Sequence, residues 1–293
     1  MNILISGASG LIGSALSNFL IQQGHSIHIL KRNNPDSEFN WAPDLGLIQL
    51  DRNTEIDAVI NLNGVNIGDK RWNNKRKAAI ISSRVNSTRL LADAILRLKK
   101  PPAVFINASA IGFYGDTGQS VKDETSSAGN NYLSDVVTQW EAAADSLKES
   151  GIRTVFIRSG VVLSNKGGAL NKMLFPFKMG LGGIIGNGKQ YMSWISLTDE
   201  IRAIDFLLNK QNIHGPVNLT APNPVDNRTF TKALGETLNR PTLFPMPSLV
   251  VKALFGEMGD MLLLGSNRIK PGVLTEHGFK FSYPDIHGAL YNA

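Results

Sequence analysis

The chain has 293 residues, of which 42% are hydrophobic and 18% charged, so it can bury a large core and is not disordered. Its formal net charge of +6 at pH 7 suits anionic ligands. The lysines and arginines are scattered rather than gathered with aromatic residues into a stripe, which argues against nucleic acid as a partner.

The same sequence disfavours several other classes of site and location. No apolar run is long enough to cross a bilayer, and the N-terminus lacks the basic start of a signal peptide, so we expect no membrane partner. There is no cysteine, which excludes disulfides and thiolate chemistry and fits a cytoplasmic location. The five histidines show no metal-ligand spacing, and no metal site is expected.

The most informative segment is the turn Gly7-Ala8-Ser9-Gly10-Leu11-Ile12-Gly13, which follows an apolar run and opens an amphipathic stretch over 11–20. Closely spaced glycines after a strand let the backbone approach a pyrophosphate, and the helix that follows points its free N–H groups at the same anion. We therefore predict a dinucleotide site. The alternative is a turn glycine at Gly7 and a close helix-to-strand contact at Gly13, with no ligand.

The next predicted strand ends in Lys31 and Arg32, where a dinucleotide fold recognises the adenosine ribose. A carboxylate there would accept hydrogen bonds from the ribose hydroxyls, whereas a guanidinium can bind a 2′-phosphate through two charge-assisted bonds. The basic pair therefore favours NADP over NAD. The alternative is that both cations belong to a solvated strand end.

Apolar runs alternate with helical patterns through the first half of the chain, which is typical of a parallel sheet. Short apolar runs bounded by turns predict strands over 2–6, 26–31, 47–50, 58–62, 103–108 and 154–158. Helical spacing predicts helices over 11–23, 73–99 and 133–150. Right-handed crossovers would build an α/β Rossmann fold, a doubly wound parallel sheet.

This alternation ends after about residue 163. A glycine-rich segment follows over 180–188, then a helix over 197–209, a short strand over 217–219 and a helical C-terminal third. We predict a small, mostly helical substrate-side lobe. The expected division is an NADP-binding domain of residues 1–163 plus 196–222 and a C-terminal lobe of residues 164–195 plus 223–293.

Two arginines are placed where they need a partner, because an unpaired buried charge is costly. Arg84 flanks the buried stripe of the helix over 73–99, whose members are Ile81, Val85, Thr88, Ala92 and Ile95. Arg158 ends the sixth predicted strand, at the sheet edge where ligands bind. For each, a cofactor phosphate or ribose and an internal carboxylate or helix-end carbonyl are equally consistent with the sequence.

Four motifs stand in a recognisable order along the chain. They are the 7–13 turn, Asn61-Leu62-Asn63-Gly64, Ser109-Ala110-Ile111-Gly112-Phe113-Tyr114-Gly115 and Trp194-Ile195-Ser196-Leu197-Thr198-Asp199. In order and spacing they resemble the extended short-chain dehydrogenase/reductases, the NAD(P)-dependent epimerase/dehydratase superfamily. The segments 64–72, 140–144, 177–188 and 221–224 and the tail are similar to an atypical subgroup with a C-terminal domain of unknown function.

The resemblance implies a Ser-Tyr-Lys site, in which the tyrosine transfers a proton, the lysine lowers its pKa and the serine binds the reacting oxygen. Ser109 matches the serine and Tyr132 the tyrosine, but the lysine position, four residues after the tyrosine, holds Val136. Without a nearby cation the tyrosine should keep a pKa near 10 and be a poor base. Tyr114, or a cation from elsewhere, is the possible substitute.

Two further regions are assigned to the substrate side. The segment 175–183 resembles the family's substrate loop, where Lys178, Lys189 and Gln190 would hold an anionic substrate or lie in solvent. The tail carries more apolar surface than a small lobe needs, which a contact with the first domain, a lid or a homodimer would use. Its apolar residues are Leu249, Val250, Leu254, Met258, Met261, Leu262 and Leu263.

These observations predict an NADP-binding oxidoreductase or epimerase that acts on a small or nucleotide-linked hydroxyl or carbonyl compound. Because the lysine is missing, an NADP(H)-sensing regulatory protein without turnover is the alternative. Ser109 and Tyr132 are placed nearest the chemistry. The predicted cofactor residues are Gly7, Ser9, Gly10, Leu11, Ile12, Gly13, Lys31, Arg32, Leu62, Asn63, Gly64 and Arg84.

Overall fold

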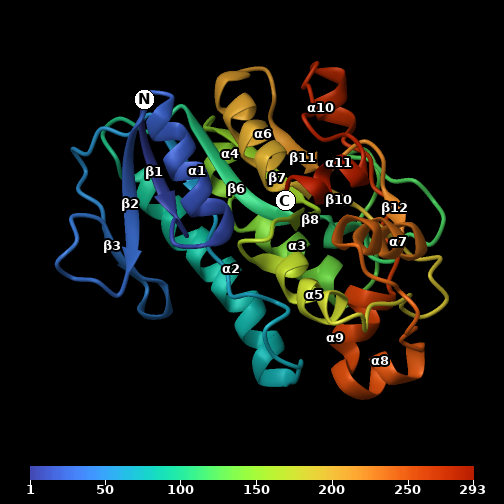
Figure 1. Ribbon diagram of the computed structural model, residues 1–293. Coiled ribbons are helices and arrows are strands. Elements are labelled where there is room, and N and C mark those ends of the chain that lie inside the picture. Colours follow the sequence, from blue (N-terminus) through green and yellow to red (C-terminus); the bar gives the residue numbers. More distant parts are fainter.

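A computed structural model describes all residues, 1–293, and its centre is one eight-stranded sheet (Figure 1). The strand order is β11-β7-β6-β5-β1-β2-β3-β4, and every pair is parallel except β3 with β4 at the edge. The bounds are β1 (Asn2–Ser6), β2 (Ser26–Arg32), β3 (Asn40–Ala42), β4 (Leu47–Gln49), β5 (Ala58–Asn61), β6 (Val104–Ala110), β7 (Arg153–Ser159) and β11 (Gly215–Leu219). The predicted α/β Rossmann fold is confirmed.

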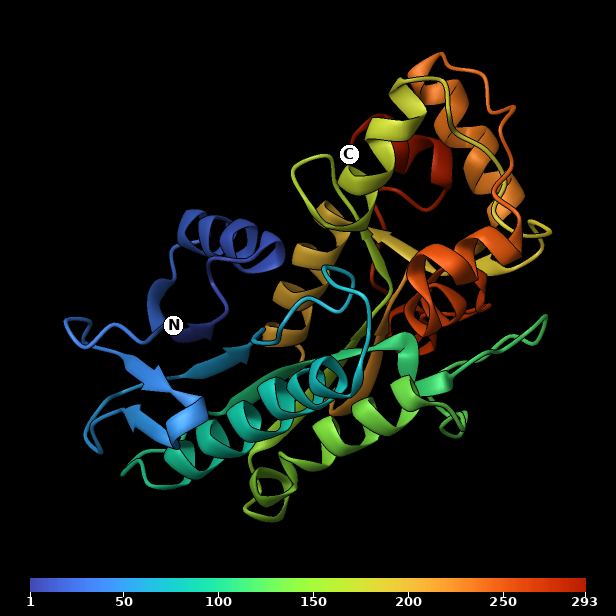
Figure 2. The same cartoon turned by 90° about the horizontal axis from the view of Figure 1, so that it is seen from below.

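Helices cover both faces of this sheet, because each strand of the centre is apolar on both sides. On one face, α1 (Leu11–Gln22) and α6 (Leu197–Asn209) pack on Ile3, Ile5 and their neighbours. On the other face, α2 (Asn74–Leu96) and α4 (Asp145–Glu149) pack on Leu4 and Phe105. Figure 2, seen from below, shows α2 lying lengthwise along the sheet on this second face.

Three predicted elements differ from the structure. The helix predicted over 133–150 is two helices, α3 (Tyr132–Ala142) and α4, separated at Ala143 and Ala144. The strand predicted over 47–50 is an antiparallel edge strand on β3, which has only three residues and was too short to show a periodic pattern. In the first half of α2, Ile80 is fully buried and the predicted Ile81 only partly, whereas the predicted Ile95 is fully buried.

The C-terminal lobe has a core of its own around Trp194, which is fully buried. Its helices are α5 (Gly168–Lys178), α7 (Asn227–Leu238) and α11 (Ile286–Tyr291), and its short strands are β8 (Val161–Leu163), β9 (Tyr191–Met192), β10 (Trp194–Ser196) and β12 (Val225–Asp226). The predicted loop over 175–183 is wrong in its first part, because 175–178 form the last turn of α5. The domain boundaries stay a prediction.

The tail docks onto the first domain. Its elements are α8 (Ser248–Phe255), α9 (Glu257–Gly259), the π-helical turn η3 (Asp260–Leu264) and α10 (Gly272–Glu276). Met258 packs with Trp72, Ile80 and Val136, so α9 closes one end of α2 and α3. Leu249 on α8 is 78% exposed, and the homodimer stays a prediction. None of the helices combines the length and the apolar composition that a bilayer span requires.

Candidate functional site

The turn after β1 can be built only with glycine at two of its positions. Gly7 has a φ of +72°, and a Cβ on it would lie 2.7 Å from the carbonyl oxygen of Leu62. A Cβ on Gly13 would lie 2.2 Å from the carbonyl oxygen of Gly7, which is far inside van der Waals contact. The glycines therefore bring the strand end, the next helix and the end of β5 together without side chains between them.

The N-terminus of α1 is left open to an anion. Its N-cap is Gly10, which supplies no side-chain acceptor, and the first turn holds no acidic residue. The Gly10 amide donates to the carbonyl of Gly7 at 3.0 Å, but the amides of Leu11 and Ile12 have no acceptor within the chain. A helix N-terminus in this state is suited to a phosphate group. Ser9 is exposed beside it.

The end of β2 carries two basic side chains and one acidic neighbour, Asp44. Lys31 and Arg32 are both exposed, as the strand end requires. Nη2 of Arg32 forms an ion pair with Oδ2 of Asp44, while Lys31 has no ion pair. Asp44 lies in the short turn η1 (Pro43–Leu45) between β3 and β4.

The residues after β5 lead from the glycine turn towards α2. The Leu62 amide donates to the carbonyl of Ser6 at 3.2 Å, which continues the sheet by one residue. Nδ2 of Asn63 donates to the carbonyl of Ser83 at 3.2 Å, and Gly64 is exposed. This segment therefore runs along α2 directly beside the glycine turn.

Arg84 is the cation next to that segment, and it has no carboxylate partner. Nη1 donates to the carbonyl oxygen of Ile80 and Nη2 to that of Val65, both at 3.1 Å. Of the partners predicted for Arg84, the structure therefore shows backbone carbonyls and no carboxylate. Burial lowers the pKa of Arg84 to about 10, since no anion compensates the charge. A Cβ on Gly64 would lie 3.2 Å from Cζ of Arg84.

Ser109 belongs to a buried ion-pair network. Its Oγ donates to Oε1 of Glu141 at 2.6 Å. Arg158 donates to the same carboxylate, from Nε to Oε1 and from Nη2 to Oε2, both at 2.8 Å. The Arg158 side chain is 4% exposed and that of Glu141 is 13% exposed. Burial alone would lower the pKa of Arg158, but hydrogen bonding and charge from Glu141 raise it above its usual value. The partner of Arg158 is thus an internal carboxylate.

The network continues to Tyr114 in the turn η2 (Ile111–Tyr114). Nη1 of Arg158 donates to the Tyr114 hydroxyl at 3.1 Å, and that hydroxyl donates to Oδ1 of Asn218 at 2.8 Å. Burial raises the pKa of Tyr114. Tyr114 is buried, and its hydroxyl has hydrogen bonds to protein groups on both sides, while its role as a substitute base stays a prediction.

Tyr132, the first residue of α3, points to the start of α2. Its hydroxyl donates to the carbonyl oxygen of Lys77 at 2.8 Å, and its ring meets Trp72 edge to face at 5.3 Å. Nζ of Lys77 lies 4.4 Å from the ring centroid, but it pairs with Glu257. Burial raises the pKa of the Tyr132 hydroxyl, and the charge of Arg84 opposes this only in part.

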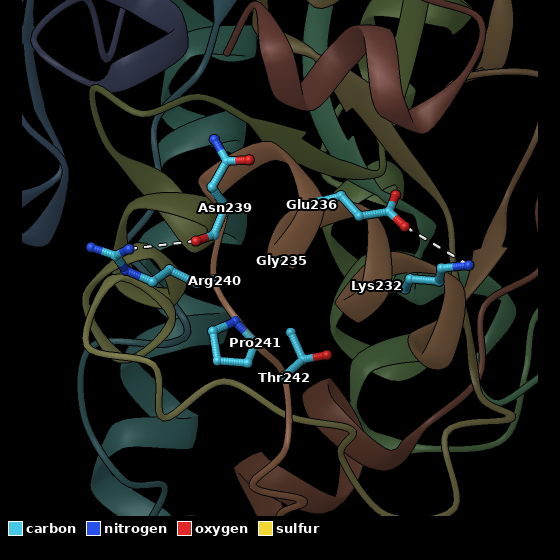
Figure 3. A pocket seen from close by; sticks show the side chains of 7 residues that line it. All are labelled: Lys232, Gly235, Glu236, Asn239, Arg240, Pro241 and Thr242. Carbon is cyan, nitrogen blue, oxygen red and sulfur yellow. Dashed lines mark hydrogen bonds and ion pairs between the residues drawn. The ribbon is translucent and has the colours of Figure 1, made fainter.

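Two of the hollows on the molecule are compared as candidate ligand sites. One of about 250 Å³ lies between η2, the start of α3 and η3, and its lining includes Gly112, Asp116, Asn131, Leu133, Asp260 and Asn267. The other, of about 320 Å³, is open and lies at the end of α7, where Lys232, Glu236 and Arg240 border it (Figure 3). It takes no residue from the sheet and none of the predicted site residues. No group of three His, Cys, Asp or Glu side chains is arranged to hold a metal ion.

Comparison with known proteins settles the family. A family model described as the NAD dependent epimerase/dehydratase family matches residues 3–219, and a domain of unknown function matches residues 246–293. The chain belongs to the NAD dependent epimerase/dehydratase family. Epimerase family protein Mb2239 from Mycobacterium bovis is 44% identical over 98% of this chain and 96% of its own length.

Solved structures agree with this epimerase/dehydratase family assignment. The crystal structure of human epimerase family protein SDR39U1 (isoform 2) with NADPH has a TM-score of 0.90 and 34% identity, and the match covers 100% of this chain and 98% of that one. A UDP-glucose 4-epimerase from Thermotoga maritima has a TM-score of 0.77 at 16% identity, over 99% and 96% of the two chains, and shows the shared fold alone.

The positions that match the Ser-Tyr-Lys site are each engaged with other parts of the protein. Val136, at the lysine position, is 3% exposed and packs with Trp72 and Met258. Glu141, which holds Ser109, is nine residues beyond Tyr132, or about 13 Å along the axis of α3. Ser109 and Tyr132 share no hydrogen bond, and each donates to a different partner within the protein.

Sequence reasoning did not assign a role to two buried carboxylates of this epimerase-family chain. Glu141 belongs to the segment 140–144, and the signal was Arg158 at the end of β7, whose charge needed a ligand or an internal acceptor. Glu200, in the first turn of α6, is fully buried and accepts from Oγ of Ser159 at 2.6 Å, while its Oε2 has no partner. Burial raises the pKa of Glu200 to about 8. No local pattern marked it.

Proposed function

We propose that the chain binds NADPH along the edge where β1, β2 and β5 end. The observation that carries this proposal is the glycine turn: a Cβ on Gly7 or Gly13 would clash with the backbone of Leu62 or Gly7, so only glycine lets the turn lie this close to the open N-terminus of α1. The pyrophosphate would lie on the amides of Leu11 and Ile12, and the 2′-phosphate would meet Lys31 and Arg32. The relative SDR39U1, crystallised with NADPH, supports the choice of cofactor.

We further propose that the protein exchanges hydride with a small or nucleotide-linked hydroxyl or carbonyl compound. When bound, the nicotinamide would supply or accept the hydride, and water would supply or accept the proton at the substrate oxygen. Membership of the epimerase/dehydratase family and the hollow of about 250 Å³ beside η2 support this reaction class. Tyr132 is not the proton donor in this proposal, because its hydroxyl bonds the Lys77 carbonyl and no lysine stands at position 136. Turnover should then lack the 10²- to 10⁴-fold that acid–base assistance provides, as an order of magnitude.

A second candidate function is an NADP(H)-sensing binding protein without turnover. One observation favours it: Ser109, Tyr114 and Tyr132 all donate to groups of the protein itself. In this case the cofactor would change the conformation or the partners of the protein instead of reacting.

Two measurements test these proposals. Calorimetric titration of the native chain and of Arg32→Ala with NADPH and NADH should give tighter binding of NADPH, and the variant should lose that preference. A panel of carbonyl compounds is then followed by the absorbance of NADPH at about 340 nm. Consumption of NADPH supports the enzyme, and NADPH-dependent stabilisation without any turnover supports the sensor. Equal affinity for NADPH and NADH would contradict the choice of cofactor.

A further inference from the structure

The ion pair at the tip of β2 is fixed by the backbone. β3 pairs with β2 in parallel, with Arg32 opposite Trp41, and η1 follows two residues later. Gly46 closes this turn in the left-handed conformation, at a φ of +66°, and so turns the chain back into β4. Asp44 is thereby presented to the Arg32 guanidinium from a neighbouring strand.

The pair gives the tip a mixed charge that the segment 26–32 alone does not show. The carboxylate of Asp44 occupies Nη2 of Arg32, one of the nitrogens that a phosphate would use to bind the guanidinium through two parallel bonds. A dianionic 2′-phosphate would also be repelled by the carboxylate itself. A ribose with a free 2′-hydroxyl would instead find an acceptor there, which is the arrangement that selects NAD.

We propose that Asp44 is a specificity-determining residue: it competes with the 2′-phosphate of NADPH for Arg32 and narrows the preference for NADPH over NADH. This inference rests on the proposed function, because it needs the dinucleotide to lie along the β2 tip. Lys31, which has no ion pair, stays available to the phosphate throughout. In this proposal Arg32 is paired with Asp44 in the free protein and exchanges this partner for the 2′-phosphate when NADPH binds.

The expected effect is moderate because the pair is exposed, with 40% of the Arg32 side chain and 68% of the Asp44 side chain accessible to water. Asp44→Asn removes the charge and keeps the shape. We expect the dissociation constant of NADPH to fall about fivefold and that of NADH to rise about twofold, as solvent screening allows. The gain for NADPH should shrink at about 0.5 M salt, where such interactions are screened.

The experiment is a calorimetric titration of NADPH and NADH into five chains: native, Asp44→Asn, Asp36→Asn, Arg32→Ala and the double variant Arg32→Ala/Asp44→Asn. Asp36 is the matched control, since it is exposed, has no ion pair and changes the net charge equally. Melting temperatures without ligand show that the variants fold alike.

The inference predicts that only Asp44→Asn strengthens NADPH binding, and that the effect vanishes in the Arg32→Ala background. Weaker NADPH binding by Asp44→Asn would overturn it, because Asp44 would then be a support that orients Arg32. Equal effects of Asp44→Asn and Asp36→Asn would also overturn it, since a general charge effect would be sufficient. Failure of the native chain to bind NADPH would instead overturn the proposed function.

Discussion

At the C-terminal ends of the strands, several polar groups near β1 and β2 lack protein partners, whereas those near β6 and β7 have them. Around β1, the amides at the N-terminus of α1 are left without acceptors, and Lys31 without a partner. Around β6 and β7, the hydroxyls of Ser109 and Tyr114 and the guanidinium of Arg158 are bound to one another or to protein groups. The first half of this sheet edge is open, with polar groups that lack protein partners, and in the second, saturated half the named side chains are paired within the protein.

This difference indicates that binding and reaction place different demands on the two halves. A site that keeps polar groups unpaired at the surface does so at little cost, since water replaces the ligand until it arrives. A buried network cannot do this, and it is stable only when all its members are satisfied. We infer that the β6–β7 half fixes the turn 111–115 in place, and that any reacting group must come from outside this network.

The largest expected effect concerns Glu200, whose Oε2 is buried without a hydrogen-bond partner next to the end of β7. Its pKa is about 8 in the folded protein against 4.5 when unperturbed, so the folded state binds one more proton between these values. The free energy of unfolding should therefore fall as the pH rises from about 4.5 to about 8. Relative to Glu200→Gln, which cannot ionise, the native chain should lose on the order of 4 kcal/mol across this window.

Urea unfolding of both chains at the two ends of the window measures this loss. The Gln side chain keeps an oxygen that can accept from Ser159, so the variant should fold at either pH. A difference between the two chains that does not change with pH would mean that Glu200 is charged throughout, and the β7 region would then hold an unpaired buried anion.

The next effect concerns the saturated network itself. Glu141→Gln removes the charge that compensates Arg158, whose side chain is 4% exposed. Breaking a buried pair by neutralising one partner costs about 3 to 5 kcal/mol, because the other charge stays buried. Chemical denaturation should show this loss, and Glu149→Gln, at an exposed position without an ion pair, should show none. A loss below about 1 kcal/mol would mean that Arg158 relaxes into water.

The same contrast explains what the sequence could predict. The glycine turn, β1 and α6 depend on residues close together in the chain, and the observed bounds of β1 and α6, 2–6 and 197–209, are those predicted. The Lys31-Arg32 pair was visible for the same reason. The missing lysine at Val136 could also be read directly, since it is a single position in a local motif.

What escaped prediction depends on residues far apart in the chain. Ser109 and Glu141 are 32 positions apart, and their contact follows from how α3 lies on β6. Asp44 meets Arg32 only because β3, a strand of three residues, pairs with β2. The placement of Tyr132 against the start of α2 likewise comes from packing with Trp72. No spacing rule along one segment contains these contacts.

A third prediction tests the open half. Gly13→Ala would place a Cβ 2.2 Å from the Gly7 carbonyl, and backbone on both sides must move to admit it. Calorimetry should show NADPH affinity reduced about 100-fold, because the turn no longer presents the amides of Leu11 and Ile12 together. Gly68→Ala is the control, since the nearest atom to its added Cβ lies 3.7 Å away. Unchanged affinity in Gly13→Ala would place the dinucleotide elsewhere.

The smallest effect decides most about the chemistry. Tyr132→Phe removes one hydrogen bond, to the Lys77 carbonyl, and should cost about 1 kcal/mol of stability. If Tyr132 were the proton donor, the same change would lower turnover about 10²- to 10⁴-fold. We expect turnover with any compound that consumes NADPH to stay within about twofold, since the hydroxyl faces α2 and not Ser109. If the variant binds NADPH but loses turnover, the Tyr132 hydroxyl must leave the Lys77 carbonyl when the cofactor is bound. Binding of the cofactor to the open half would then change the hydrogen bonds of the saturated half.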